Sequence, residues 1–206
     1  MHKSKTTSNA HIVLLDNFDS FTYNLVDQFR SLGYPVTIYR NSLTVEQMEQ
    51  ALAEKDNPVL VLSPGPGAPA DAGCMPALIK KVRGKVPMIG ICLGHQAIVE
   101  AYGGKVEGAG DIVHGKSAMM KHSGHTVFGT LPSPLSIARY HSLVATNVPE
   151  ALETVADVDG LVMAVVNNED RVCGYQFHPE SILTTQGAQL LISTLNWVTS
   201  KPGLSV

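Results

Sequence analysis

The chain has 206 residues, a formal net charge of −3 and three cysteines. This length suits one domain with a sizeable core, and the slight acidic balance argues against a nucleic-acid or membrane-surface protein, which would carry a basic excess. Charged residues make up only 16%, against roughly 25% in a typical soluble domain. The fold is therefore expected to bury or cover more of its surface than average.

The cysteines and the N-terminus both point to a reducing compartment. Cys74, Cys92 and Cys173 are odd in number and far apart, which does not suit a disulfide framework. No apolar run approaches the roughly 18 residues of a membrane span, and residues 1–10 lack the apolar core of a signal peptide. We predict a cytoplasmic protein with a disordered leader at 1–10 and one domain at 11–200, in which Cys74 and Cys173 are packing residues.

The first half of the chain alternates short apolar runs with amphipathic stretches. The apolar runs predict strands at residues 12–15, 36–39, 59–62 and 86–91. The stretches that follow them predict helices at residues 21–32, 44–54, 71–82 and 93–102. Asp19 or Ser20 is expected to cap the first helix and Thr44 the second. Repeated strand–helix units at short spacing predict a parallel sheet with helices on both faces.

The pattern changes after Gly104. Short β-like pieces separated by turn residues follow at 111–113, 154–156, 161–166 and 172–177, and a last helix is expected at 185–198. We interpret the short pieces as antiparallel strands added to one edge of the sheet. The predicted fold class is α/β, an open and mostly parallel sheet with helices on both faces and antiparallel additions in the C-terminal half.

A sharp strand-to-helix turn is expected at Cys92. The segment Gly90-Ile91-Cys92-Leu93-Gly94 has the form of the G-x-S-x-G nucleophile elbow, with cysteine in place of serine. A sulfur at a helix N-terminus is favoured as thiolate, and the Leu93 N–H, in the first helical turn, is able to meet an oxyanion. The alternative is a small buried cysteine at a tight turn.

A histidine and a glutamate follow the last predicted strand, in the order His178-Pro179-Glu180. Pro179 holds His178 extended, and residues two apart in an extended chain point the same way. The Glu180 carboxylate is thus expected to orient the His178 imidazole, giving a Cys–His–Glu triad if this strand ends beside Cys92. The alternatives are a plain strand-end turn and a metal pair, which lacks an evident third ligand.

A Pro/Gly loop, Ser63-Pro64-Gly65-Pro66-Gly67, follows the third predicted strand. It is not a phosphate-binding P-loop, because no Gly-Lys-Ser/Thr follows. The N–H groups of Gly65 and Gly67 are sterically open to an oxyanion or a substrate carboxylate. The alternative is a simple turn.

Five motifs of this chain occur together in one enzyme family. They are the segments 16–22, 63–67, 90–96, 139–143 and 176–181. In this order, and over about residues 11–198, they resemble the class I (triad) glutamine amidotransferases. Within the family the sequence most resembles the glutaminase subunits of anthranilate synthase, and the glutaminase subunits of aminodeoxychorismate synthase are the alternative.

The resemblance implies a flavodoxin-like fold and the hydrolysis of L-glutamine. Cys92 would be the nucleophile, His178 the base and Glu180 the group that orients it. The N–H groups of Gly65 and Leu93 would form the oxyanion hole. Glutamine would be bound by Gly65, Pro66, Gly67, Gln96, Ser142 and Leu143.

The resemblance also implies a partner, a chorismate-utilising synthase subunit that receives the ammonia. No cofactor or metal is expected in this chain, Mg²⁺ is expected only on the partner, and neither nucleic acid nor membrane is an expected partner. Two rival functions remain open. A non-catalytic module on the same scaffold should lack Cys92, His178 or Glu180, and a cysteine peptidase with the same elbow would not need the glycine loop or segment 139–143.

Overall fold

The computed structural model describes residues 8–200, which form one mixed sheet in the order β2-β1-β3-β4-β9-β8-β7-β5-β6. The first five strands of this order are parallel. They are β2 (Val36–Arg40), β1 (His11–Asp16), β3 (Pro58–Leu62), β4 (Met88–Ile91) and β9 (Val172–Tyr175). The parallel sheet predicted from the first four strands is confirmed, and the carboxyl ends of its strands share one edge. Strand β9 was expected to be one of the antiparallel additions, and that prediction is wrong: β9 pairs in parallel with β4 and antiparallel with β8, so the sheet changes direction only after β9.

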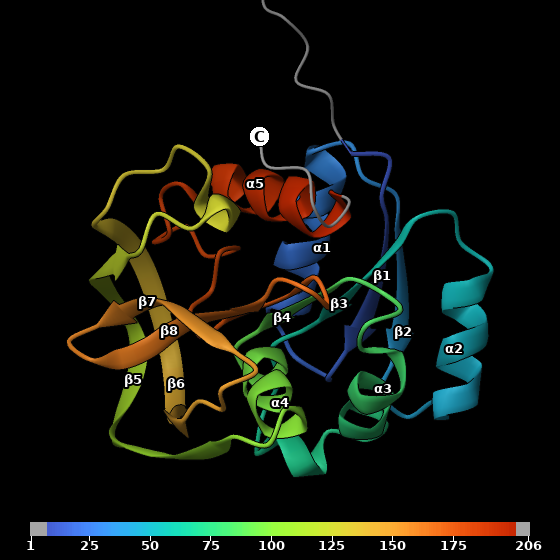
Figure 1. Ribbon diagram of the computed structural model, residues 1–206, viewed down its shortest axis with the longest axis horizontal. Coiled ribbons are helices and arrows are strands. Elements are labelled where there is room, and N and C mark those ends of the chain that lie inside the picture. Colours follow the sequence, from blue (N-terminus) through green and yellow to red (C-terminus); the bar gives the residue numbers. More distant parts are fainter. Residues whose placement is uncertain (1–7, 201–206) are drawn as a thin grey trace, which may run out of the picture.

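The central strands are apolar on both faces because helices cover both faces. In β1, Ile12 and Leu14 belong to one core cluster, whereas Val13 and Leu15 belong to the other. Figure 1 shows the two layers of helices on either side of the sheet. One layer contains α1 (Thr22–Ser31) and α5 (Gly187–Thr199), and the other contains α2 (Val45–Ala53), α3 (Met75–Val82) and α4 (Leu93–Ala101).

N-cap residues were predicted for α1 and α2, and only the prediction for α2 is confirmed. The Thr44 hydroxyl accepts from the Gln47 N–H and the Gln47 side chain accepts from the Thr44 N–H, so the cap predicted for α2 is confirmed as a capping box. The cap predicted for α1 is wrong. Phe21 occupies the N-cap position without a side-chain cap, and the Asp19 carboxylate accepts from the Phe21 N–H at 2.9 Å, just before the helix.

Helix α3 is shorter than the predicted 71–82 because Gly73 interrupts it. Gly73 adopts φ +54°, and a Cβ there would lie 2.2 Å from the Asn41 carbonyl oxygen. The chain therefore makes a short 3₁₀ turn at Pro69–Asp71 and enters α3 only at Met75.

Antiparallel strands extend the sheet beyond β9, as predicted. They are β8 (Leu161–Asn167), β7 (Glu153–Val158), β5 (Lys105–His122) and β6 (Leu135–Asn147). The sequence predicted only residues 111–113 of β5 and nothing of β6. Three register shifts interrupt the β5–β6 pairing, and Gly110 and Gly115 have positive φ, so the alternation that would have revealed this long hairpin is broken.

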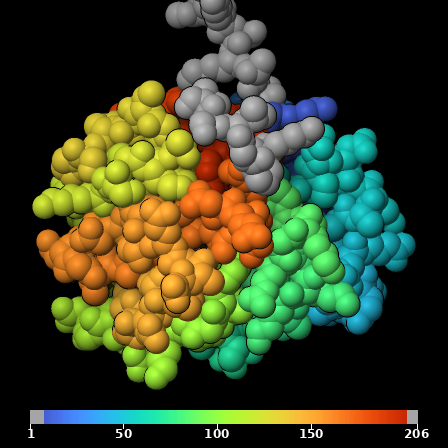
Figure 2. Space-filling model, viewed as in Figure 1, coloured from blue at the N-terminus to red at the C-terminus, as the bar shows by residue number. Residues whose placement is uncertain are grey.

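The alternation of strands and helices ends before β5, at Lys105. Residues 8–104 are called the N-terminal half and residues 105–200 the C-terminal half. The two halves are in direct contact on the face shown in Figure 2. Among residues 8–200, no helix is long and apolar enough to cross a membrane. Residues 1–7 of the expected leader lie outside the described residues, while Ala10 is buried beside the start of β1.

Candidate active site

Cys92 lies in a strained turn between β4 and α4. Its backbone has φ +52° and ψ −101°, a conformation that non-glycine residues rarely adopt. A Cβ on Gly90 would lie 2.6 Å from the Gly94 backbone, and one on Gly94 would lie 2.4 Å from the Leu62 carbonyl oxygen. Glycine is therefore required on both sides of Cys92, because α4 starts pressed against β3 and β4.

The sharp turn is tied to the neighbouring strand. The Cys92 N–H donates to the Tyr175 carbonyl oxygen at 2.8 Å, and Ile91 pairs with Tyr175. Strand β9 thus ends beside Cys92, which was the condition for His178 to reach it.

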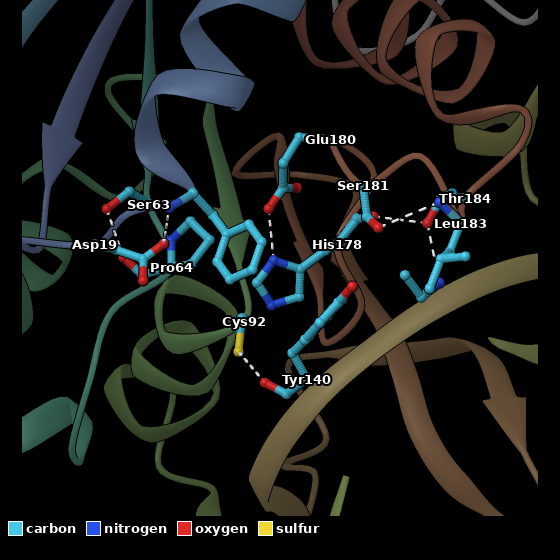
Figure 3. A network of polar contacts seen from close by, with 12 residues as sticks. Asp19, Ser63, Pro64, Cys92, Tyr140, His178, Glu180, Ser181, Leu183 and Thr184 are labelled. Carbon is cyan, nitrogen blue, oxygen red and sulfur yellow. Dashed lines mark hydrogen bonds and ion pairs between the residues drawn. The ribbon is translucent and has the colours of Figure 1, made fainter. Parts of the chain in front are cut away.

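His178 and Glu180 form a buried pair. His178 Nδ1 lies 2.5 Å from Glu180 Oε1, and their side chains are 2% and 0% exposed. Figure 3 shows the imidazole between the Glu180 carboxylate and the Cys92 side chain. Across residues 8–200, no group of three or more His, Cys, Asp or Glu side chains is placed to hold a metal ion.

The backbone of His178 is fixed by residues from other segments. Its N–H donates to the Ala138 carbonyl oxygen at 3.1 Å, and its own carbonyl accepts from the Thr184 hydroxyl at 2.6 Å. The same hydroxyl oxygen accepts from the Ala138 N–H at 3.0 Å. Thr184 therefore joins β6 to the turn that carries His178 (Figure 3).

The electrostatic surroundings of His178 favour its protonated form. Burial by itself lowers the pKa of the imidazole, but hydrogen bonding and charge interactions with Cys92 and Glu180 outweigh burial and raise the pKa to about 10. The imidazole is therefore protonated near neutral pH, with Nδ1 facing the Glu180 carboxylate.

Two aromatic rings enclose the imidazole. The Phe21 and Tyr140 ring centroids lie 5.3 Å and 5.2 Å from the centroid of His178, and 5.2 Å from each other. Phe21 comes from the start of α1 and Tyr140 from β6. Their contacts restrict the orientation of the imidazole and exclude water from its faces.

The glycine loop packs directly onto the Cys92 turn. A Cβ on Gly65 would lie 2.8 Å from the Leu93 side chain and 2.6 Å from the Asn17 Cβ. The Asn17 amide donates to the Ser63 carbonyl at 2.9 Å, and the Asn17 N–H donates to the Ser63 hydroxyl at 2.8 Å. Asn41 donates to the Asn17 side-chain oxygen, so the loop is pinned from two sides.

A cavity of 290 Å³ opens beside Cys92, at the small end of the range for small-molecule sites. Seven of the ten predicted site residues line it: Gly65, Pro66, Gly67, Cys92, Gln96, Ser142 and Leu143. Its other lining residues are Ile112, Val113, His114, Tyr140 and His141. The cavity therefore lies between the two halves of the chain. Leu93, His178 and Glu180 adjoin Cys92 but do not line the cavity.

One wall of this cavity is held by neutral groups. His141 Nδ1 and Gln96 Nε2 each lie 3.1 Å from the Leu143 carbonyl oxygen, which accepts from both. Burial, and then the charge of Arg139, lower the pKa of His141 to about 4. His141 is therefore neutral near pH 7, with its Nε2 accepting from the Arg139 Nε–H at 3.1 Å.

A larger cavity, of 570 Å³, lies at the opposite edge of the parallel strands, beside Pro58, Pro87 and Arg171. Its lining residues do not include Cys92 and contain no cysteine, histidine or carboxylate. The chemistry of the side chains, rather than cavity size, favours the candidate site at Cys92.

Comparisons with known proteins show the family of the chain. Residues 13–196 match the family model of the class I glutamine amidotransferases. The chain belongs to the class I glutamine amidotransferase family. It is 66% identical to anthranilate synthase component 2 of Vibrio parahaemolyticus, over 93% of this chain and 98% of that one. It is 47% identical to anthranilate synthase component 2 of Haemophilus influenzae, over 93% of this chain and 100% of that one.

The fold likeness extends to distant members of the family. A glutamine amidotransferase from Thermotoga maritima superimposes with a TM-score of 0.76, covering 94% of this chain and 99% of that one, at 16% identity. At that identity the comparison speaks for the fold alone. The chain is a glutamine amidotransferase, and its mixed sheet is the fold of that family.

Several residues that organise the site of this amidotransferase were not identified from the sequence. Asn17, Phe21, Tyr140 and Gln176 lie within the family motifs, but no local pattern reveals their contacts. Asn17 bonds to Ser63, the Phe21 and Tyr140 rings contact His178, and Gln176 contacts Cys92. Their contacts join segments that are far apart in the chain. Only the order of strands β4, β9 and β6, together with the end of β1, brings them together.

Proposed function

We propose that this amidotransferase is the glutaminase subunit of an anthranilate synthase, which hydrolyses L-glutamine at Cys92 and passes the ammonia to a chorismate-aminating subunit. The observation that carries the proposal is the placement of Cys92 on the wall of a small cavity, with the His178–Glu180 pair beside it. A nucleophile, a base and an orienting carboxylate are what a cysteine amidohydrolase requires.

In the proposed first step, Cys92 attacks the side-chain amide carbon of glutamine. The carbon–sulfur bond forms as the carbonyl electrons move to oxygen, and the N–H groups of Gly65 and Leu93 stabilise the oxyanion. His178 donates its proton to the nitrogen, the carbon–nitrogen bond breaks, and ammonia leaves a glutamyl thioester on Cys92. A pKa of about 10 suits His178 to hold this proton until the attack.

In the second step, His178 takes a proton from water as the water oxygen attacks the thioester carbon. Acylation has removed the negative sulfur, which is one of the two partners that raise the pKa of His178. The imidazole becomes a better general base at the stage that needs one. The carbon–sulfur bond then breaks, the sulfur leaves as thiolate, and the proton stays on His178, which restores the starting state. The balance is glutamine and water giving glutamate and ammonia.

Glutamine fits the polar parts of the cavity. The backbone at Ser142 and Leu143, the Gln96 amide and the loop from Gly65 to Gly67 provide hydrogen-bond donors and acceptors for an α-amino acid. The glycine loop and segment 139–143, which a peptidase would not need, both contribute to the cavity wall and argue against the peptidase alternative. The presence of Cys92, His178 and Glu180 argues against a non-catalytic module.

An exposed apolar side chain on the cavity wall supports a protein partner. Ile112 lines the cavity and is 69% exposed. Phe18, which follows β1, and Ile182, which follows β9, are also exposed, at 54% and 93%. Single exposed apolar residues are ordinary, but one at the opening of a candidate site is available to an interface. We propose that the synthase subunit covers the cavity at Ile112, so that ammonia is released against the partner.

The relatives favour tryptophan biosynthesis over the folate alternative. Those of Vibrio parahaemolyticus and Haemophilus influenzae are both named anthranilate synthase component 2. Copurification with the partner, followed by identification of the aromatic product, separates the two: anthranilate supports the proposal, and aminodeoxychorismate overturns the choice of pathway.

The direct test of the glutaminase is ammonia release from glutamine, with and without the synthase subunit. We expect weak release from the isolated chain, stimulation by the partner, and none from Cys92→Ala. Cys74→Ala is the matched control, because Cys74 lies at the start of α3, outside the site. Absence of ammonia from the wild-type complex, or equal release by Cys92→Ala, would overturn the proposal.

A further inference from the structure

Gln176 is a fully buried polar residue that faces the nucleophile and has no part in the mechanism above. It lies between the end of β9 and His178, and its side chain is 0% exposed. Its Nε2 donates to Cys92 Sγ at 3.6 Å. Buried amides need hydrogen-bond partners, and one N–H of this amide has the sulfur as its partner.

The orientation of the Gln176 amide follows from its neighbours. The Leu143 carbonyl oxygen only accepts hydrogen bonds, so the Gln96 atom 3.1 Å from it is the amide nitrogen. The same nitrogen lies 3.1 Å from the Gln176 Oε1 and donates its second proton there. The Gln176 oxygen is thereby occupied, and its N–H group is left facing Cys92.

The Leu143 carbonyl, at the start of this chain of hydrogen bonds, is held in place by a second donor. The Leu143 carbonyl also accepts from the Nδ1–H of neutral His141, whose tautomer is set by the Arg139 donor on Nε2. The polarity therefore runs in one direction, from a backbone carbonyl on the cavity wall, through two amides, to the sulfur. Gln96 and Leu143 line the cavity, whereas Gln176 lies behind it.

We propose that Gln176 is a further catalytic residue, whose N–H donates to the Cys92 thiolate and whose orientation is imposed by Gln96 and the Leu143 carbonyl. The inference rests on the proposed role of Cys92 as nucleophile. A hydrogen bond to an anionic acceptor is stronger than one to the neutral form, so this donor is placed to stabilise the anionic sulfur. Gln96 is then a positioning residue for the nucleophile as well as a cavity residue.

The test measures the rate at which iodoacetamide alkylates Cys92 across the pH range, with peptide mass spectrometry to identify the modified cysteine. For Gln176→Met we expect alkylation about tenfold slower on the acid side of the pH profile, because a hydrogen bond to a charged group is lost. The midpoint of the pH profile should rise by about one unit, and the limiting rate at high pH should match wild type. Gln50→Met, on the exposed face of α2, is the matched control.

A purely structural role for Gln176 predicts a different profile. Altered access to Cys92 would slow alkylation by the same factor at every pH and leave the midpoint in place. That result, or a wild-type profile, would overturn the inference. If Gln176→Met does not fold, Gln176→Asn replaces it in the same assay. Asparagine keeps an amide but is too short to reach the sulfur, so the same shift of the midpoint is expected.

The role of Gln96 is tested by non-additivity. Gln96→Met should raise the midpoint in the wild-type background, because the Gln176 amide is no longer held, and should have no further effect in Gln176→Met. Equal effects in both backgrounds would overturn the relay. Cys92 alkylation does not require glutamine turnover, so these results are distinguishable from a failure of the proposed function, which Cys92→Ala tests by ammonia release.

Discussion

In the N-terminal half the conformation of Cys92 depends mainly on close packing around a strained turn, whereas in the C-terminal half His178 is held by hydrogen bonds and ring contacts from distant segments. The Cys92 turn depends on a positive φ and on glycines two residues to either side. His178 depends on Ala138 from β6, Thr184 from the following turn and Phe21 from α1. The cavity lies where the Cys92 turn meets the segments of the C-terminal half.

The difference teaches which kind of change each half tolerates. A strained turn between packed elements has no room for extra atoms, so it is sensitive to steric change. A side chain held by several hydrogen bonds from other segments is sensitive to the loss of any one partner. Substitutions that add atoms should therefore be most damaging around Cys92 in the N-terminal half. Substitutions that remove a hydrogen-bond partner should be most damaging around His178 in the C-terminal half.

The largest effect is expected from Glu180→Gln, which keeps the shape of the C-terminal pair and removes its charge. The amide no longer stabilises a protonated His178, and we expect glutamine turnover to fall about 10³-fold or more. Ammonia release by the complex with the synthase subunit measures this. Asp157→Asn, at a half-buried position of β7 where the carboxylate accepts from the Gly160 N–H, serves as the control. Near-wild-type turnover of Glu180→Gln would contradict the account.

The sharpest break in the N-terminal half is Gly94→Ala. The new Cβ would lie 2.4 Å from the Leu62 carbonyl oxygen, so α4 must shift and move Cys92. Although alanine favours a helix by about 1 kcal/mol, we expect a net loss of about 2 kcal/mol in the free energy of unfolding, by analogy with overpacked cores. Urea denaturation measures it.

Gly108→Ala is the matched control for that substitution, since no atom lies within 4 Å of a Cβ there. A Gly94→Ala protein as stable as Gly108→Ala would show that the helix start has room to spare.

A smaller effect is expected from Thr184→Val in the C-terminal half. Valine has the shape of threonine but leaves the His178 carbonyl and the Ala138 N–H without their partner. We expect a loss of about 1–2 kcal/mol of stability and a fall in turnover. Thr185→Val, at an exposed neighbouring position, should change neither. Equal results for the two valines would mean that Thr184 does not hold His178.

The smallest effects concern pH, where two histidines of the C-terminal half act in opposite directions. His178 has its pKa raised to about 10, so its contribution to stability is complete below pH 6.5 and is lost as the pH rises towards 10. His141 has its pKa lowered to about 4, so its contribution is complete above pH 6.5 and is lost as the pH falls towards 4.

NMR titration of the imidazole C–H signals measures both groups directly. At pH 8 we expect a protonated His178 and a neutral His141. A neutral His178 at pH 8 would show that Cys92 and Glu180 do not stabilise its protonated form. The expected contrast between the raised pKa of His178 and the lowered pKa of His141 would then be contradicted.

The sequence predicted most of the N-terminal half because its signals are local. The apolar runs gave the parallel strands, Thr44 marked the start of α2, and the spacing around Cys92 indicated the turn. The same was true of His178 and Glu180, whose alternation along an extended segment placed them on one side.

The rest depends on pairings between distant segments. Strands β5 and β6 were largely missed because bulges and glycines with positive φ disrupt their alternation. Gln176 touches Cys92 because β9 lies next to β4, and Phe21 touches His178 because α1 begins where β1 ends. No pattern within either segment carries that information.

The central claim is that Cys92 forms a covalent glutamyl intermediate with His178 as its proton carrier. The most direct measurement is mass spectrometry of the His178→Asn protein after incubation with glutamine and the synthase subunit, since deacylation needs the base more than a slow acylation does. The account predicts a glutamyl adduct on the peptide that contains Cys92. An adduct on Cys74 or Cys173, or turnover at the wild-type rate without the histidine, would contradict it.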